Sequence, residues 1–133
     1  MRFTLRDAHL TDATIDIARG SITIDDKHIQ AVKGPADQPG EQGNIIDATD
    51  MIVMPGFIDV HTHGGGGYNL HTREADEIRA YSRWTPETGV TSFLIAIVGV
   101  PDSMPEQQLR AAVEALNGRT VGAEPLGIHL EGP

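Results

Sequence analysis

The amino-acid sequence predicts an α/β protein in which a small β-sheet region precedes alternating strands and helices. Residues 1–53 hold short segments in which apolar and polar residues alternate, separated by turn-forming Gly and Asp. From residue 54 onward, apolar strand-like segments alternate with segments of helical periodicity. We therefore expect two domains, residues 1–53 and 54–133, with three strands and two helices in the second.

The first region is predicted to be a β-sheet layer. Alternation of apolar and polar residues is typical of strands with one buried face. The polar Pro/Gly-rich stretch 35–44 is predicted to be a loop, after which strand-forming residues return. The expected strands before that loop lie at 2–10, 13–18, 21–26 and 28–34.

The second region begins with a strand over "FIDVH" (57–61) and a helix that follows Thr72. Thr72 is the expected N-cap, with Glu74 and Asp76 in a first turn that favours acidic side chains. Pro86 is expected to kink or end this helix. Its buried face is predicted to comprise Ala75, Ile78, Tyr81 and Trp84.

A second strand and helix follow. The run 91–100 is almost uninterrupted apolar sequence, as expected of a parallel strand covered on both faces. Ser103 and Glu106 form a capping-box pattern with Pro105 in the first turn. "PLGIHLEG" (125–132) is the third strand, so the β-α-β-α-β order predicts right-handed parallel units in an open sheet or part of a barrel. The inward residues of the second helix are expected to be Leu109, Val113 and Leu116.

Two histidines at the end of the first of these strands predict a metal site. Residues two apart in a strand point the same way, so His61 and His63 share a face, with Asp59 one step deeper. Ordinary loop or core histidines are the alternative interpretation. Position at the carboxyl end of a parallel strand, where α/β folds place their sites, favours a divalent cation. His71, nearby in sequence, is expected to be a solvated loop residue.

The third strand repeats this arrangement with His129 and Glu131. Glu131 could reach the same centre; a helix-capping or ion-paired glutamate is the alternative. Gly64 and Gly65, in the run of four glycines, leave no side chains to block a ligand, which makes them candidate substrate-binding residues. A tight turn would use the same glycines.

Composition restricts the partners. With 19 acidic against 10 basic residues and a net charge of −9, nucleic acid and anionic membranes are not expected as partners. The chain has no cysteine, no secretory signal pattern and no apolar run of bilayer-spanning length. We expect a cytoplasmic protein.

Three stretches carry a resemblance to a known family. "MPGFIDVHTHG" resembles the first barrel strand of the amidohydrolase superfamily. "TGVTSFL", followed by "LGIHLEGP", resembles the N-acetylglucosamine-6-phosphate deacetylase family within it. The resemblance implies the N-terminal portion of a (β/α)8 TIM-type barrel preceded by a small β-sandwich region. The barrel is incomplete in this chain, which has three of the expected barrel strands.

The resemblance also implies a site. Glu131 would be a metal ligand, and His61 and His63 would hold an additional metal position, with one or two divalent ions, Zn or Fe. Asp59 and His129 would support the ligands from outside. The catalytic Asp that acts as general acid and base is expected beyond Pro133.

The implied reaction is metal-dependent deacetylation of N-acetylglucosamine 6-phosphate, which yields glucosamine 6-phosphate and acetate. The substrate would be a small-molecule sugar phosphate, and the full-length protein is expected to be a homodimer. One alternative is another amidohydrolase, a cyclic-amide hydrolase or a deaminase, which would share the H-x-H strand and lack the "HLEGP" carboxylate. Another is a non-catalytic truncated fragment, and we expect residues 1–133 alone to be inactive.

Overall fold

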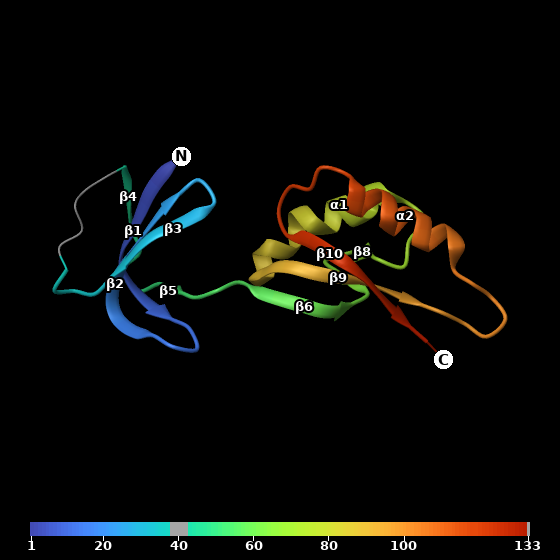
Figure 1. Ribbon diagram of the computed structural model, residues 1–133, viewed down its shortest axis with the longest axis horizontal. Helices are drawn as coiled ribbons and strands as arrows, with labels where there is room; N and C mark the ends of the chain where they lie inside the picture. The colour runs from blue at the N-terminus through green and yellow to red at the C-terminus, as the bar shows by residue number, and fades with distance from the viewer. Residues whose placement is uncertain (38–42, 133) are drawn as a thin grey trace. The chain divides into compact units, whose positions relative to one another are not determined.

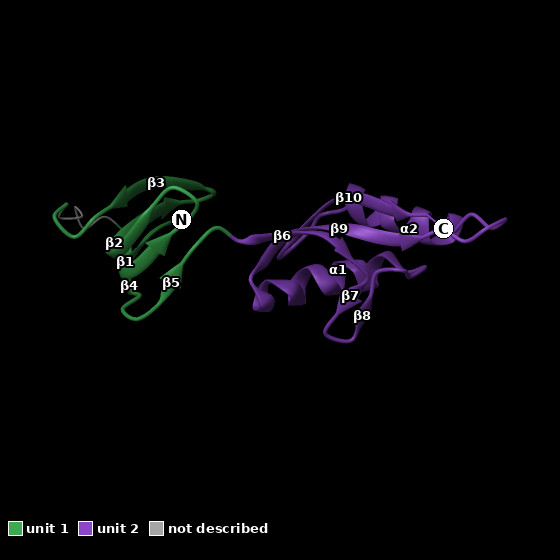
Figure 2. Ribbon diagram, turned by 90° about the horizontal axis from the view of Figure 1, so that it is seen from below, with its two compact units in different colours: residues 1–55 green, residues 56–133 purple. Residues whose placement is uncertain are grey.

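The computed structural model of the chain describes residues 1–37 and 43–132. These form two compact units, Met1–Pro55 and Gly56–Pro133 (Figure 2). Each unit has a buried apolar cluster of its own. Within the predicted loop 35–44, residues 38–42 lie outside the described residues.

Unit 1 is a single five-stranded sheet in the order β3-β2-β1-β4, with β5 also paired to β1 (Figure 1). β1, β2 and β3 run antiparallel, whereas β4 and β5 run parallel to β1. The predicted sheet layer is therefore present. The bounds are β1 Arg2–Thr11, β2 Asp16–Asp25, β3 His28–Lys33, β4 Asn44–Asp47 and β5 Ile52–Val53.

The core of unit 1 is small. Its buried cluster consists of Ala8, Leu10, Ile22 and Ala48. A β-sandwich buries its apolar faces between two packed sheets, and the described residues of this unit form one sheet. The second layer of the expected sandwich is therefore not formed by the part of the chain that the structure describes.

Unit 2 contains a three-stranded parallel sheet in the order β10-β9-β6, with two helices on one face (Figure 1). The order of these elements along the chain is β-α-β-α-β, so the predicted α/β class is confirmed. The described strands form an open sheet. The bounds are β6 Phe57–Thr62, α1 Ala75–Trp84, β9 Val90–Val98, α2 Glu106–Asn117 and β10 Glu124–Glu131.

The core of unit 2 lies between this sheet and the helices. Phe93, Ile95 and Ile97 alternate along β9, and all three are fully buried. Tyr81 of α1 packs edge-on against Phe93, with ring centroids 4.9 Å apart. Burial of each such side chain stabilises the fold by about 1.5–3 kcal/mol, so β9 is the main support of the unit. The helices add Ala75 and Ile78 from α1, and Ala112 and Ala115 from α2.

The start of α1 differs from the prediction. The helix begins at Ala75, so Glu74 occupies the N-cap position and not the first turn. Thr72 does not cap the helix; its Oγ1 accepts a hydrogen bond from the Glu74 amide at 3.2 Å and closes the preceding turn. Trp84 is the last residue of α1 and is partly buried against the core. The predicted end near Pro86 is confirmed, because α1 passes there into a 3-10 turn, η1 Thr85–Thr88.

The capping box predicted for α2 is wrong. Pro105 occupies the N-cap position and makes no side-chain cap. The Ser103 amide instead donates to the Val100 carbonyl at 3.2 Å in a separate turn, so the proline displaces the cap by two residues. Val113, predicted to be inward, is 48% exposed. Small residues allow close approach, so the helix turns its alanine face, Ala111, Ala112 and Ala115, to the core.

A short hairpin that the sequence did not predict follows β6. Its strands are β7 Gly64–Gly65 and β8 Tyr68–Asn69. Gly66 has φ +60°, and a Cβ there would lie 2.2 Å from Trp84 Cε2, so the hairpin tip requires glycine. No helix among the described residues is long and apolar enough to cross a membrane.

Candidate metal centre

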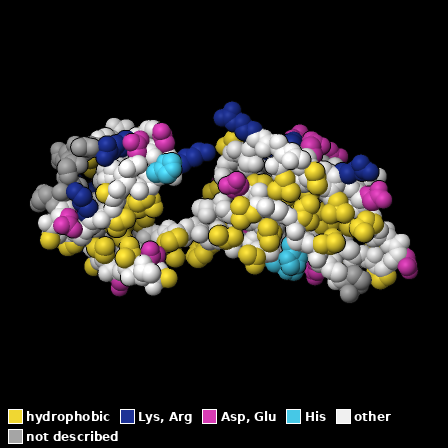
Figure 3. All heavy atoms as spheres, viewed as in Figure 1, with side chains coloured by type: hydrophobic (Ala, Val, Ile, Leu, Met, Phe, Trp, Pro, Cys, Tyr) yellow, Lys and Arg dark blue, Asp and Glu magenta, His cyan; other side chains and the backbone are white. Residues whose placement is uncertain are grey.

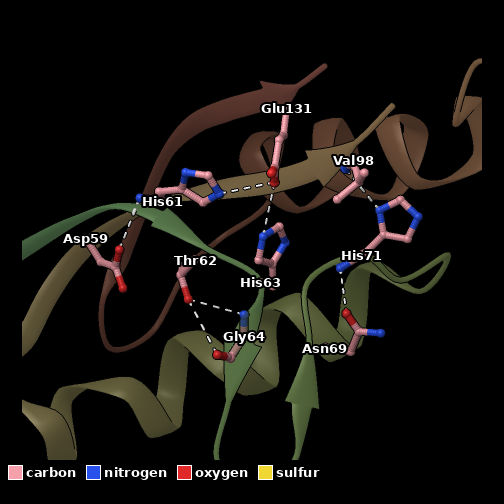
Figure 4. Close-up of polar contacts among 9 residues, drawn as sticks. All are labelled: Asp59, His61, Thr62, His63, Gly64, Asn69, His71, Val98 and Glu131. Atoms are coloured by element: carbon pink, nitrogen blue, oxygen red, sulfur yellow. Dashed lines mark hydrogen bonds and ion pairs between the residues drawn. The ribbon is translucent and has the colours of Figure 1, made fainter. Parts of the chain in front are cut away.

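Three predicted ligands meet at the carboxyl ends of β6 and β10 (Figure 4). The Nε2 atoms of His61 and His63 each lie 3.2 Å from the same oxygen, Oε2 of Glu131. The ligand atoms of the three residues all lie within 4.8 Å of one another. Among the residues that the structure describes, His61, His63 and Glu131 form the one cluster of three such side chains whose ligand atoms are close enough to hold a metal ion.

The alternation of side chains in the strands brings these residues to one face. Thr62 is buried and pairs with Ile95 of the core, so the histidines on either side of it point away from the helices. On β10, Ile128 pairs with the same Ile95, whereas Glu131 pairs with Val98. Because the strands are parallel, their carboxyl ends lie at one edge of the sheet, and the ligands from β6 and β10 meet across β9.

The donor set suits a catalytic type of metal site. Two imidazole nitrogens and one carboxylate oxygen are ligands that Zn and Fe accept. Three protein donors leave a coordination position open for water or substrate. The side chains of His61, His63 and Glu131 are 43%, 50% and 40% exposed, so an ion and a ligand can reach them. The residues present therefore fit the predicted divalent ion.

Asp59 and His129 lie beside this group. Oδ1 of Asp59 accepts a hydrogen bond from the backbone amide of His61 at 3.1 Å, and so holds the main chain of a predicted ligand. The ring of His129 lies 4.4 Å, centroid to centroid, from the ring of His61 at an interplanar angle of 33°. These contacts suit the supporting function predicted for both residues, which stays a prediction.

Gly64 and Gly65, predicted to contact substrate, lie in β7. Gly64 has φ +116°, and a Cβ there would lie 2.2 Å from the Tyr68 carbonyl oxygen. A Cβ on Gly65 would approach the Trp84 ring to 3.3 Å. The structure thus gives both glycines a packing reason within the hairpin, and substrate contact stays a prediction.

His71 is not the freely solvated loop residue that the sequence predicted. It is half-buried, and its Nδ1 accepts a hydrogen bond from the Val98 amide at 3.3 Å (Figure 4). Its own amide donates to Asn69 Oδ1 at 2.8 Å. His71 thus fastens the loop after the hairpin to the end of β9. This bond joins residues 27 apart in the chain, so no local sequence pattern predicts it.

The same loop is anchored to α1 by Glu77. Hydrogen bonds from the Thr72 hydroxyl and from the Asn69 amide hold the pKa of Glu77 below its ordinary value. The Asn69 amide lies 2.9 Å from Glu77 Oε1. The carboxylate is therefore favoured in its charged form, and it fixes the loop that leads from the histidines to α1.

Comparison with known proteins adds sequence relatives. The chain is 32% identical over 132 residues to an N-acetylglucosamine-6-phosphate deacetylase of Bacillus subtilis (strain 168), an alignment that covers 97% of this chain and 33% of the relative. The chain thus spans about a third of the length of the curated relatives it matches. No protein-family model matches the chain.

Solved structures agree with these relatives. The crystal structure of N-acetylglucosamine-6-phosphate deacetylase from Pasteurella multocida matches the whole chain over 35% of its own length, with a TM-score of 0.82 and 23% identity. A D267A mutant of the Mycobacterium smegmatis enzyme, in complex with N-acetyl-D-glucosamine-6-phosphate, matches with a TM-score of 0.72 and 30% identity, covering 100% of this chain and 32% of the enzyme. The resemblance predicted from the sequence is confirmed by these relatives.

Proposed function

We propose that this chain, a relative of N-acetylglucosamine-6-phosphate deacetylases, supplies the metal centre of a metal-dependent amidohydrolase that deacetylates N-acetylglucosamine 6-phosphate. The observation that carries the proposal is the convergence of His61, His63 and Glu131 within 4.8 Å at one edge of a parallel sheet. Unit 2 would supply the first strands of a (β/α)8 TIM-type barrel, and unit 1 a layer of the flanking β-sandwich. The names of the relatives support the substrate class.

The three proposed ligands would differ in the charge that they bring to the metal ion. His61 and His63 would bind through neutral Nε2 atoms, while Glu131 would supply one negative charge toward a divalent ion. All three donors face one centre, so they suit a single Zn or Fe ion. The carboxylate has a second oxygen, and a second ion would need further donors in addition to these three.

The reaction breaks the amide bond between the acetyl carbon and the sugar nitrogen. His61, His63 and Glu131 would hold a divalent ion, which when bound would supply polarisation of the amide carbonyl and a water of lowered pKa, toward about 7. Oxygen from water joins the acetyl carbon, and a proton passes to the leaving amine. A carboxylate other than Asp59 would move this proton, because Asp59 is engaged with the His61 amide and lies deeper on the strand.

The remaining expectations belong to the same proposal. A sugar phosphate is a small anion, and a chain with a net charge of −9 needs basic groups close to the substrate to bind it. We also propose that the full-length protein is a homodimer and that it is located in the cytoplasm, as the sequence predicts.

Acetate release tests the function directly. The protein, expressed from its complete reading frame, should release acetate from N-acetylglucosamine 6-phosphate when loaded with Zn or Fe. Activity should disappear on chelation and return when the metal is restored. A cyclic amide such as hydantoin serves as the matched control substrate. Turnover of hydantoin without turnover of the sugar phosphate would refute the substrate assignment, and full activity after chelation would refute the metal dependence.

A further inference from the structure

The two histidines of the metal centre are held differently. His61 lies within β6, whereas His63 comes directly after the last residue of that strand. The His63 carbonyl accepts a hydrogen bond from the amide of Leu70, a fully buried residue, at 2.9 Å. The His63 carbonyl and the Gly64 amide belong to the same peptide group, so the bond made by the Gly64 amide holds the opposite side of the peptide that follows the imidazole.

Thr62 makes that bond. Its Oγ1 accepts a hydrogen bond from the Gly64 amide at 3.2 Å, and the Gly64 carbonyl lies 3.5 Å from the same oxygen (Figure 4). The side chain of Thr62 points into the core, where the residue is 8% exposed. The hydroxyl therefore lies on the opposite side of the strand from the imidazoles and is hydrogen-bonded to the backbone of the residue that follows His63.

Tyr81 completes this arrangement from α1. Its Oη lies 3.4 Å from Thr62 Oγ1 in a buried contact, and its ring packs edge-on against Phe93. A threonine hydroxyl has one donor and two acceptor positions. Donation from Tyr81 and from the Gly64 amide fills both acceptors, and donation to the Gly64 carbonyl uses the proton. The hydroxyl is then fully satisfied, and its orientation is fixed by the core.

We infer that Thr62, held by Tyr81, is a positioning residue that sets the His63 imidazole for metal binding. The inference rests on the proposed metal centre. Removal of the hydroxyl would leave the partly buried Gly64 amide and the buried Tyr81 hydroxyl without this partner, and an unsatisfied amide favours a shift of the backbone toward another partner. Because His63 lies after the last residue of β6, we expect this backbone movement to shift the position of the His63 imidazole ring.

The test uses Co²⁺ as a spectroscopic probe in the protein expressed from its complete reading frame. Thr62→Val keeps the shape of the side chain and removes the hydroxyl. We expect a Co²⁺ Kd about 10–100-fold higher, the loss typical of removing a group that orients a ligand, together with a changed visible absorption spectrum. Thr62→Ser should restore both. Tyr81→Phe removes one of the three contacts, so it should shift Kd in the same direction by less, and it remains informative if Thr62→Val does not fold.

Thr85 provides the matched control. It is 1% exposed in the same unit, and its Oγ1 has no hydrogen-bond partner among the described residues. Thr85→Val therefore makes the same chemical change in a buried threonine that is not connected to the histidines, and it should leave the Co²⁺ Kd and spectrum unchanged. A loss of affinity in Thr85→Val equal to that in Thr62→Val would overturn the inference, because general destabilisation would then explain both.

Two further outcomes separate the inference from the metal centre itself. If Glu131→Ala abolishes Co²⁺ binding while Thr62→Val and Tyr81→Phe bind with wild-type affinity and spectrum, the positioning function of Thr62 is refuted and the metal centre stands. If the wild-type protein binds no Co²⁺, or Glu131→Ala binds as tightly as wild type, the metal centre is refuted and the inference is refuted with it.

Discussion

The two units differ in what covers their sheets. In unit 2 the helices bury a cluster of ten residues against one sheet face, whereas the buried cluster of unit 1 contains four. Large apolar residues of unit 1 stay at the surface, and Ile29 and Ile52 are each 64% exposed. A sheet gains a core only when a second layer packs on it. Unit 2 also leaves large apolar side chains exposed, such as Ile58 and Val60 at 60% each, so the units differ in the size of the buried core and not in the presence of exposed apolar residues.

The units also differ in how they use histidine and carboxylate. Unit 1 contains a pair, with Nε2 of His9 2.5 Å from Oδ1 of Asp16. Unit 2 joins His61 to Glu131 at 3.2 Å and adds His63 at the same distance. Figure 3 shows histidine side chains gathered at the surface of unit 2 beside an acidic side chain. Two neighbouring groups in unit 1 make a hydrogen-bonded pair, whereas His63, directly after β6, adds a third donor in unit 2 and makes a group that fits a metal ion.

Replacement of Glu131 should have the largest effect, because it removes the charged donor that both imidazoles face. Glu131→Ala should abolish tight metal binding and acetate release together, a loss larger than the roughly 10–100-fold caused by removing an outer-shell partner. Asp16→Ala makes the same change in the histidine pair of unit 1 and should leave metal content intact. Elemental analysis and an acetate assay measure both variants, and full metal content with normal turnover in Glu131→Ala would contradict the assignment.

Removal of both imidazoles comes next. His61→Asn combined with His63→Asn should lower the number of bound ions per chain by at least one, because two of the three donors are replaced. The fold should persist, since both side chains are largely exposed. Metal stoichiometry and far-UV circular dichroism are the measurements. An unchanged ion count in the double variant would show that the histidines hold no ion.

Core truncation tests the difference in packing. Phe93→Ala should lower the free energy of unfolding by about 3–5 kcal/mol, because it removes a fully buried ring between sheet and helices. Leu10→Ala in unit 1 should cost near the lower end of about 2–5 kcal/mol. In urea unfolding, fluorescence of Trp84, the one tryptophan of the chain, reports unit 2, and far-UV circular dichroism, which detects both sheets, reports the loss in unit 1. Equal losses in the two variants would contradict the contrast between the cores.

The hairpin glycines give a smaller effect. Gly66→Ala and Gly67→Ala both place a side chain at positive φ, +60° and +91°, which strains the backbone by about 1–3 kcal/mol. A Cβ on Gly66 also collides with Trp84, whereas one on Gly67 has nothing within 4 Å. Gly66→Ala should therefore lower the free energy of unfolding by about another 1–3 kcal/mol through overpacking, and its thermal midpoint should lie below that of Gly67→Ala. Equal midpoints would mean that the ring moves aside freely.

The smallest effect is expected at a turn of unit 1. Hydrogen bonds from the Thr14 amide and hydroxyl, and from the Ile15 amide, hold the pKa of Asp12 below its ordinary value. The stabilisation is fully present above the unfolded pKa, about 3.9, and is lost as pH falls through the lower folded pKa. Asp12→Ala should therefore be slightly less stable than wild type at pH 7, and the difference should close below pH 4. Urea midpoints across this range measure it. A difference that stays constant down to pH 2 would rule out the carboxylate as its source.

Sequence patterns predicted the parts of the fold that depend on local periodicity. The β-α-β-α-β order follows from apolar runs and helical spacing, and the approach of Glu131 to the two histidines follows from strand alternation and parallel pairing. The start of α2 was not predictable from its capping pattern, because Pro105 displaces the cap that Ser103 suggested. Val113 was misplaced because spacing alone does not reveal that alanines allow the closer packing.

The contacts that hold the backbone around the proposed metal centre were the least predictable part of the structure. The bond of His71 to Val98 and the contact of Tyr81 with Thr62 join residues 27 and 19 apart. Such contacts depend on the packed fold and have no local signature. In the sequence, Thr62 lies between two candidate metal ligands and has no pattern of its own. Its burial in the structure shows that its hydroxyl faces the core, on the side of the strand opposite to the imidazoles.

The separation of His61 from Glu131 in the chain, 70 residues, has a consequence for folding. Closing a loop of that length costs on the order of 4 kcal/mol of chain entropy, and only the completed β9 core offsets it, so the metal centre should form late. An ion that binds only the folded state adds stability by mass action, about 2.7 kcal/mol at a hundred times its Kd. The ion would then act as a reversible cross-link between the two outer strands of unit 2. Thermal unfolding of unit 2 should shift with metal concentration, while unit 1 should melt at a fixed temperature.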